Sequence, residues 1–279
     1  MELTAVGKRY GRGGRWILRE VHLSVAAGEL VRIAGANGSG KSTLLRLAAG
    51  IERPSTGTVA RPGPVAYVPE RFPPALPFDA ASYLLRTGRV HGLTAAQARR
   101  RAGEWLDRFG IADRAGTPLS RLSKGTCQKV AVAQALMAEP RVLLLDEAWT
   151  GLDPQARAVL DEAAAERAAR GGAVLFVDHD PARLAGRTAA VHRVGADGAL
   201  SAEREESARA GPVVEIEVDL PDGSPLPERL PGAPEATALG GTAVRLAVSS
   251  AHSDALLRSL LVGRPGVRVL AVRRRGAER

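Results

Sequence analysis

Cysteines and long apolar segments are both scarce in this chain. Cys127 is the single cysteine among 279 residues, which excludes an internal disulfide and a cysteine-bound metal cluster and indicates a reducing compartment. No run of about 18 or more apolar residues occurs, so we expect no membrane-spanning helix. The first residues lack a basic region followed by an apolar segment, so we also expect no secretory signal. A role at a membrane would therefore require a separate partner in the bilayer.

Lysine is scarce as well, although the chain is basic. Only four of the 39 basic residues are lysines, and the net charge is +9. Such a charge can indicate nucleic-acid binding, but the arginines are spread along the chain instead of forming one binding surface. We interpret Arg99–Arg101 as a solvated helix face and Arg273–Arg275 as part of a charged tail. We expect no nucleic-acid partner.

The most informative stretch, Gly35–Thr43, fits the pattern G-x-x-x-x-G-K-[ST] without a gap. The flanking residues predict a strand at Leu30–Ala34 and a helix at Thr43–Ala49, which is the context that this pattern requires. Glycines let the backbone curl so that successive N–H groups face an anion at a helix N-terminus. We expect Lys41 to reach the β- and γ-phosphates and Ser42 to ligate Mg²⁺. The residues expected to bind a nucleoside triphosphate are Gly35, Asn37, Gly38, Ser39, Gly40, Lys41, Ser42 and Thr43.

Two adjacent carboxylates follow an apolar run. Val142–Leu145 is continuously apolar, which predicts a parallel strand buried on both faces, and Asp146 and Glu147 end it. Asp146 is expected to hold Mg²⁺ directly or through water. Glu147 is expected to orient and deprotonate the water that attacks the γ-phosphate. An Asp-Glu pair can also simply start a helix, but its place after a buried strand favours the chemical role.

Strand and helix patterns alternate over the first 205 residues. This alternation predicts a mostly parallel α/β sheet, with a helical subdomain at about 72–138 that separates Lys41 from Asp146. A shift in composition near 201–212 predicts a boundary between a domain at 1–205 and a smaller domain at 206–279. The helices expected in the first domain are Ala80–Arg89, Thr94–Gly110, 123–138 and Pro154–Arg170, and a further buried strand is expected at Val174–Val177.

The smaller domain is expected to be a β-β-α-β appendage of the α+β class. Its strands are expected at Val214–Val218, Ala243–Val248 and Val267–Val272, and Pro221–Pro234 is expected to be a loop. A helix at Ser250–Val262 is expected to carry four leucines on one side, namely Leu256, Leu257, Leu260 and Leu261. No catalytic constellation is visible there. We interpret the appendage as a packing or dimerisation module, with a ligand- or partner-sensing regulator as the alternative.

Five motifs together resemble the ordered motif set of the ATP-binding cassette (ABC) ATPases. They are similar to the Walker A, signature, Walker B, D-loop and H-loop sequences of that family, and they lie in this order at Gly35–Thr43, Leu122–Gln128, Leu143–Glu147, Gly151–Asp153 and His179. The resemblance covers about residues 1–205. It implies a P-loop NTPase fold of ABC ATPase type with a helical subdomain, and ATP and Mg²⁺ as cofactors.

The resemblance also implies a mechanism that needs two copies of the chain. Two such domains would pair head to tail and enclose two ATP molecules. Ser123 and Gly125 of one copy would contact the γ-phosphate held by Lys41 of the other, and Asp153 would lie at the dimer seam. His179 would bridge the γ-phosphate and the catalytic water. Hydrolysis would therefore depend on closure of a homodimer.

Other positions resemble the family less closely. Tyr10 lies where the family places an aromatic residue that stacks on adenine, with Trp16 as the competing candidate. Glu70 replaces the usual glutamine of the Q-loop, and its carboxylate is expected to reach Mg²⁺ or the attacking water. Ala148 and Trp149 replace the usual proline and small residue after the catalytic glutamate. These departures concern rate and coupling, because each leaves the groups required for the reaction in place.

The function that this resemblance implies is ATP hydrolysis coupled to transport. We expect the ATPase subunit of a bacterial, exporter-type ABC transporter, held at the cytoplasmic face of the membrane by a separate permease that docks on residues 72–122. The alternative is a non-transport ABC ATPase that acts on nucleic acid or the ribosome, but such proteins usually carry two cassettes or a long coiled coil. A small-molecule kinase with a phosphate loop does not explain Leu122–Gln128 and His179 together.

Overall fold

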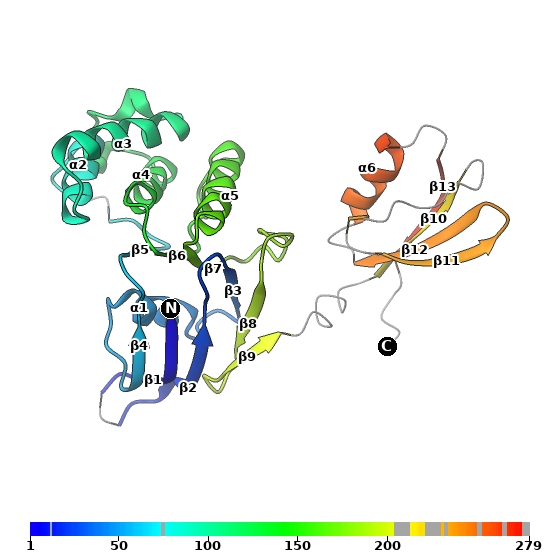
Figure 1. The fold of residues 1–279 in the computed structure, drawn as a ribbon, viewed down its shortest axis with the longest axis horizontal. Helices are drawn as coiled ribbons and strands as arrows, with labels where there is room; N and C mark the ends of the chain where they lie inside the picture. The colour runs from blue at the N-terminus through cyan, green and yellow to red at the C-terminus, as the bar shows by residue number, and fades with distance from the viewer. Residues whose placement is uncertain are drawn as a thin grey trace. The chain divides into compact units, whose positions relative to one another are not determined.

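The computed structural model describes residues 1–11, 13–73, 76–203, 213–220, 230–231, 234–249, 253–263 and 267–274. The chain forms two compact units, which comprise residues 1–202 and 203–279 (Figure 1). Among the described residues, no helix combines the length and the apolar character that a bilayer crossing requires.

A six-stranded sheet forms the centre of the first unit. Its strands have the order β5-β6-β7-β3-β8-β9, and the four pairs from β5 to β8 are parallel. Every residue of β6 and β7 is buried, as expected for parallel strands covered on both faces. The prediction of a mostly parallel α/β sheet is confirmed. In sheet order the strands are Val65–Val68, Val142–Asp146, Ala173–Val177, Leu30–Ala34, Ala190–Val194 and Leu200–Glu203.

Alternate residues of β6 face two different layers. Leu143 and Leu145 belong to a core shared with the helices α2 to α5. Val142 and Leu144 belong to a second core, shared with helix α1 and an antiparallel sheet (Figure 1). The strand period of two thus divides one continuous apolar run between both layers. The elements of the second layer are α1 (Lys41–Ala49), β1 (Glu2–Arg9), β2 (Trp16–Ser24) and β4 (Thr56–Ala60), with the strand order β2-β1-β4.

The helical layer consists of α2 (Ala80–Val90), α3 (Ala95–Arg108), α4 (Lys124–Met137) and α5 (Pro154–Ala169), with short 3-10 turns at Ala112–Arg114 and Leu119–Arg121. Thr94 caps α3 through a reciprocal capping box with Gln97, which explains why this helix begins where the sequence predicts. Gly88 allows close packing, because a Cβ there would lie 2.8 Å from Cε of Met137. Arg101 differs from its expected solvated role, since it donates to the carbonyl of Met137 and pairs with Glu139.

The second unit is a four-stranded antiparallel sheet with one helix. Its strand order is β11-β12-β10-β13, and its core includes Ile216, Leu246, Leu256 and Leu260. The elements are β10 (Val213–Asp219), β11 (Glu235–Gly240), β12 (Ala243–Ser249), α6 (Ser253–Gly263) and β13 (Arg268–Arg274).

The structure corrects several details of this unit. Strand β11 was not predicted, because all six of its residues are exposed and give no alternating pattern. The prediction that Leu261 shares a side with Leu256 is wrong: Leu261 is 53% exposed, because five residues of helix rotate a side chain well away from the first. Arg273 and Arg274 belong to β13 instead of a tail. Arg275, most of the predicted 221–234 loop and residues 250–252 lie outside the described residues.

Candidate active site

The phosphate loop lies between the end of β3 and the start of α1. Gly35, Gly38 and Gly40 have φ angles of 145°, 76° and 108°, which residues with a Cβ rarely adopt. The loop is also tightly enclosed, because a Cβ on Gly35 would lie 2.8 Å from the carbonyl oxygen of Val194. The ammonium group of Lys41 donates to the carbonyls of Gly35 and Ala36, both at 2.9 Å. The loop backbone therefore holds this cation where it faces the loop.

A buried carboxylate at the end of β6 meets the start of α1. Oδ1 of Asp146 accepts a hydrogen bond from the Ser42 hydroxyl at 3.0 Å, and Oδ2 accepts one from the Tyr67 hydroxyl at 2.9 Å. Asp146 is 2% exposed. Burial raises its pKa, and the two hydrogen bonds oppose that rise. The structure therefore brings together Ser42 and Asp146, which lie 104 residues apart in sequence.

Tyr67 is a member of this group that the sequence analysis missed. Burial raises the pKa of its hydroxyl, and the nearby charge of Asp146 raises it further, so Tyr67 remains a hydrogen-bond donor. Tyr67 ends up beside Asp146 because β5 and β6 are parallel neighbours, with Tyr67 in register with Leu144. The available signal was an aromatic residue near the carboxyl end of a strand that adjoins the strand of Asp146.

The donor set of Ser42 and Asp146 fits a magnesium ion. Both groups offer oxygen atoms, and Mg²⁺ typically takes one or two carboxylates together with substrate phosphates and water. Among the residues that the structure describes, no cluster of three or more His, Cys, Asp or Glu side chains is arranged to hold a metal alone. Glu70, the third expected ligand, instead forms an ion pair with Arg71 at 3.6 Å. Its negative charge still contributes to the raised pKa of Asp146.

Glu147 and His179 meet at the carboxyl ends of β6 and β7. Oε1 of Glu147 lies 2.9 Å from Nε2 of His179. The backbone N–H of Glu147 donates to the carbonyl of Val177 at 3.0 Å, and its φ of 50° places it in the left-handed region. The Glu147 side chain is 16% exposed, whereas the His179 side chain is 58% exposed. A carboxylate in this position is sheltered from bulk water and held against an accessible imidazole.

A third group of predicted residues gathers around the start of α4. The Ser123 hydroxyl caps this helix by accepting from the backbone N–H of Thr126 at 3.2 Å. A Cβ on Gly125 would lie 2.6 Å from the carbonyl oxygen of Gly151, so this close approach requires glycine. Asp153 caps α5 and pairs with Lys129 at 2.7 Å. That hydrogen bond from Lys129 lowers the pKa of Asp153.

Gln128 connects this third group to the catalytic segments. Its side-chain amide donates to the carbonyls of Pro69 and Ala148, both at 3.3 Å, and the residue is 4% exposed. Pro69 precedes Glu70, and Ala148 follows Glu147. Gln128 is the last residue of the signature-like motif Leu122–Gln128, and the sequence alone predicts no role for it. Its position, one helical turn into α4 and facing inward, was the available signal.

The two aromatic candidates for adenine stacking each carry a cation on the ring. The Tyr10 hydroxyl donates to Glu52, at 2.8 Å from Oε2, and Lys8 lies 4.9 Å from the centre of the ring. Tyr10 is 51% exposed. The guanidinium of Arg9 lies 4.9 Å from the centre of the Trp16 ring. Tyr10 thus offers an accessible aromatic surface at the end of β1.

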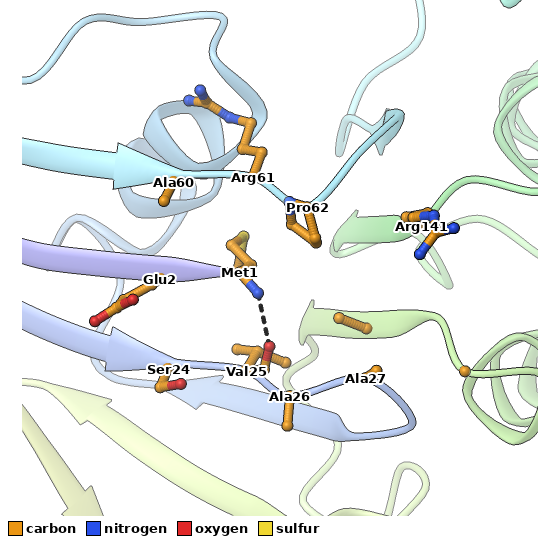
Figure 2. Close-up of a pocket in the computed structure, with 12 residues that line it drawn as sticks. Met1, Glu2, Ser24, Val25, Ala26, Ala27, Ala60, Arg61, Pro62 and Arg141 are labelled. Carbon is orange, nitrogen blue, oxygen red and sulfur yellow. Dashed lines mark hydrogen bonds between the residues drawn. The ribbon is translucent and has the colours of Figure 1, made fainter.

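A cavity of about 370 Å³ opens at the other end of the sheet. Figure 2 shows it beside the start of β1, where the amino group of Met1 donates to the carbonyl of Val25 at 2.8 Å. Arg141 and Ala173, which line it, lie at the starts of β6 and β7. In open α/β sheets ligands bind at the carboxyl ends of the strands, where Asp146 and Glu147 lie. The cavity is therefore separate from the candidate active site.

The phosphate loop before α1, the Asp-Glu pair after β6 and the histidine after β7 define a phosphate-loop nucleoside triphosphatase. Comparison with known proteins narrows this class. The model of the "ABC transporter" family matches residues 18–150. The zinc import ATP-binding protein ZnuC of Cereibacter sphaeroides is 42% identical over 174 residues, which are 61% of this chain and 69% of that protein. The chain belongs to the ABC transporter family. Within that family it is an ATP-binding and ATP-hydrolysing subunit.

Solved structures agree with this assignment. The structure titled "Structure of ATP binding subunit of ABC transporter" has a TM-score of 0.68 and 26% sequence identity, and the match covers 75% of this chain and 91% of that chain. A dimeric ATP-binding cassette in a post-hydrolysis state with ADP and Pi has a TM-score of 0.65 at 24% identity, and the match covers 73% and 97% of the two chains. The second similarity shows the fold alone. The predicted family, fold class and ATPase activity are confirmed.

Proposed function

We propose that this chain drives transport through a separate integral-membrane permease by closing with a second copy around ATP. The observation that carries the proposal is the convergence of three groups at the carboxyl ends of neighbouring strands: Lys41 in the phosphate loop, the Ser42–Asp146 pair, and the Glu147–His179 pair. Phosphate binding and proton removal are the two tasks that hydrolysis of ATP requires.

Each residue has a separate task in the proposed mechanism. Lys41 and the loop N–H groups bind the phosphates. Glu147 accepts the proton of the attacking water, and His179, whose Nε2 lies 2.9 Å from Oε1 of Glu147, orients that water. Ser42 and Asp146 would hold a Mg²⁺ ion, which neutralises phosphate charge when it is bound.

The exposed start of α4 supplies the part of the site that a second copy would use. Ser123 is exposed, and it lies at a helix N-terminus, where backbone N–H groups and the helix dipole favour an anion. We propose that Ser123 and Gly125 contact the γ-phosphate held by the other copy, with Asp153 at the seam. A cassette of the same fold forms a dimer with bound ADP and Pi, which agrees with the pairing of two copies that this proposal requires.

The permease is proposed to dock on the helical segment at 72–122, which would hold the chain at the cytoplasmic face of the membrane. Membrane proteins co-purified with the tagged chain would identify this partner, and recovery of the chain with ribosomes or nucleic acid alone would contradict it. The name of the zinc import ATP-binding protein gives the cargo of that relative only. The exporter direction predicted for this chain stays a prediction.

Replacing Glu147 by glutamine tests closure around ATP. Glu147→Gln keeps the shape of the side chain but removes the base, so hydrolysis is expected to fall by about 10²–10⁴-fold while ATP binding persists. Gel filtration with ATP and Mg²⁺ is then expected to show a stable dimer. A persistent monomer that still binds ATP would contradict the two-copy mechanism.

A further inference from the structure

One carboxylate on α5 joins two segments that follow the proposed catalytic residues. Oδ1 of Asp161 accepts a hydrogen bond from Nε1 of Trp149 at 2.8 Å. Oδ2 accepts one from Nη1 of Arg183, also at 2.8 Å. Trp149 comes two residues after Glu147, and Arg183 comes four residues after His179. The Trp149–Asp161–Arg183 bridge therefore connects the segment of the proposed base to the segment of the proposed histidine.

The bridge is packed firmly. Trp149 is 2% exposed and meets the Phe176 ring edge to face at 5.8 Å between ring centres. The Arg183 side chain is 14% exposed, and its guanidinium lies 5.5 Å from the centre of the Trp149 ring. The Asp161 side chain is 30% exposed, so the two hydrogen bonds are partly buried, and the one from Arg183 is charge-assisted at both ends. Short charge-assisted bonds restrict the side chains that make them. The two ends of the bridge are thus held in fixed positions relative to α5.

Arg183 also faces the residues on both sides of His179. Its guanidinium lies 3.8 Å from Asp178 and 3.7 Å from Asp180. In addition, Arg32 on β3 donates to the backbone carbonyls of Asp178 and Pro181 at 3.0 and 3.1 Å. The segment that carries His179 is therefore fixed by one arginine through side chains and by another through the backbone.

We propose that Asp161 is a positioning residue for ATP hydrolysis, an inference that rests on the roles proposed above for Glu147 and His179. Its carboxylate holds the two segments in fixed positions relative to each other, so that the imidazole of His179 stays beside the carboxylate of Glu147. Asp153, the proposed seam residue, caps the N-terminus of α5, the helix that carries Asp161. Asp161 consequently joins three segments: the one after the base, the one after the histidine, and the helix that begins at the seam.

The central test is Asp161→Asn, which keeps an oxygen acceptor for Trp149 but removes the negative charge that pairs with Arg183. A displacement of about 1 Å in a catalytic group can cost about 100-fold in rate. A smaller displacement of His179 relative to Glu147 is therefore expected to lower kcat about tenfold. KM for ATP and the affinity for a fluorescent ATP analogue are expected to change by less than about twofold. Only a positioning role predicts this separation of kcat from binding.

A matched control lies one residue further along the same helix. The Glu162 side chain is 68% exposed, and its one ion pair among the residues that the structure describes is with Arg108 at 3.9 Å. Glu162→Gln therefore removes the same charge from the same helix without touching the bridge. We expect wild-type kcat and KM for this variant. A tenfold loss in Glu162→Gln as well would assign the effect to the charge of α5 and overturn the proposal.

The other end of the bridge gives a second test. Arg183→Met breaks the same link, so the Asp161→Asn/Arg183→Met double variant is expected to lose no more activity than the worse single variant. Fully additive losses would overturn the proposal, as would wild-type kcat in Asp161→Asn or a parallel loss of kcat and ATP affinity. If Asp161→Asn fails to fold, Trp149→Phe removes one donor of the bridge together with part of a buried ring, and wild-type kcat in that variant overturns the proposal.

Glu147→Gln separates this inference from the function on which it rests. Wild-type hydrolysis by Glu147→Gln would refute the proposed base, and the bridge would then have nothing to position. Loss of hydrolysis by Glu147→Gln together with wild-type kcat in Asp161→Asn would refute the bridge alone.

Discussion

The proposed ATP site has two parts, the phosphate loop with Asp146 and the start of α4 with Ser123. The two parts differ in where the hydrogen-bond partners of their polar side chains come from. At the phosphate loop, Lys41 and Asp146 are buried: Lys41 donates to two carbonyls of its own loop, and Asp146 accepts from the distant Ser42 and Tyr67. At the start of α4, Ser123 is exposed, and within the described part of the chain its hydroxyl bonds only to Thr126, three residues away. A buried polar group needs such partners to offset the cost of its desolvation. The first part is therefore shaped before ligand arrives, and the second presents a helix end to whatever approaches it.

The largest effect is expected from a substitution in the buried part of the site, the phosphate loop. Lys41→Ala removes a cation that the loop holds through two carbonyl hydrogen bonds. Removing one member of a buried charged contact costs about 2–5 kcal/mol, which corresponds to a loss of ATP affinity of about 30-fold or more. Isothermal titration calorimetry with ATP and Mg²⁺ measures this loss. Lys124→Ala, an exposed lysine next to Ser123, is the control and is expected to keep wild-type affinity in the monomer.

The next effect separates the cap of α4 from its proposed contact with a second copy. Ser123→Asp keeps a good N-cap but presents a carboxylate to the γ-phosphate of the other copy. We expect an unchanged melting temperature, unchanged ATP binding by the monomer, and hydrolysis lowered by about tenfold or more, since removal of one such stabilising donor costs 10²–10³ in comparable sites. Wild-type hydrolysis in this variant would assign Ser123 a structural role alone.

Tyr67→Phe tests the buried part of the site through its effect on the free energy of unfolding. The variant removes a hydrogen bond to the buried Asp146, and loss of a bond to a charged group is expected to cost about 1.5–3 kcal/mol at neutral pH. Burial raises the pKa of Asp146, so this group makes the folded protein less stable as pH rises through the carboxylate range. The hydrogen bond from Tyr67 opposes the rise in the pKa of Asp146. Its loss is therefore expected to raise that pKa further and to steepen the loss of stability as pH rises.

Urea denaturation at about pH 4 and about pH 7 checks this expectation. The difference between wild type and Tyr67→Phe is expected to be largest at the higher pH and to shrink where Asp146 becomes protonated. Tyr83→Phe is the control, because burial raises the pKa of that hydroxyl too, but Tyr83 belongs to α2, away from Asp146. An equal cost at both pH values would show that the Tyr67 bond does not depend on the charge of Asp146.

The sequence was sufficient for the elements whose reasons are local. Thr94 and Ser123 cap their helices as expected, and the apolar runs of β6 and β7 form buried strands. Contacts that depend on the pairing of distant strands were less accessible. Tyr67 reaches Asp146 only because β5 lies beside β6.

The bridge through Asp161 needed the structure for the same reason. Trp149, Asp161 and Arg183 come from three separate segments, and no motif places them together. Strand β11 was missed for a different reason, because none of its side chains is buried. Pattern reasoning detects burial within one element, and it detects contacts between elements only where a known motif already implies them.

The smallest expected effect comes from removing the second unit. The two parts of the proposed ATP site lie within residues 1–202, which form one compact unit. Deletion of 206–279, the proposed smaller domain, is therefore expected to leave ATP affinity within about twofold of wild type. Calorimetry on the truncated protein, with circular dichroism as the check on folding, measures this. A folded truncation that no longer binds ATP would mean that the second unit completes the site, and the contrast between a buried and an exposed part would then have to include it.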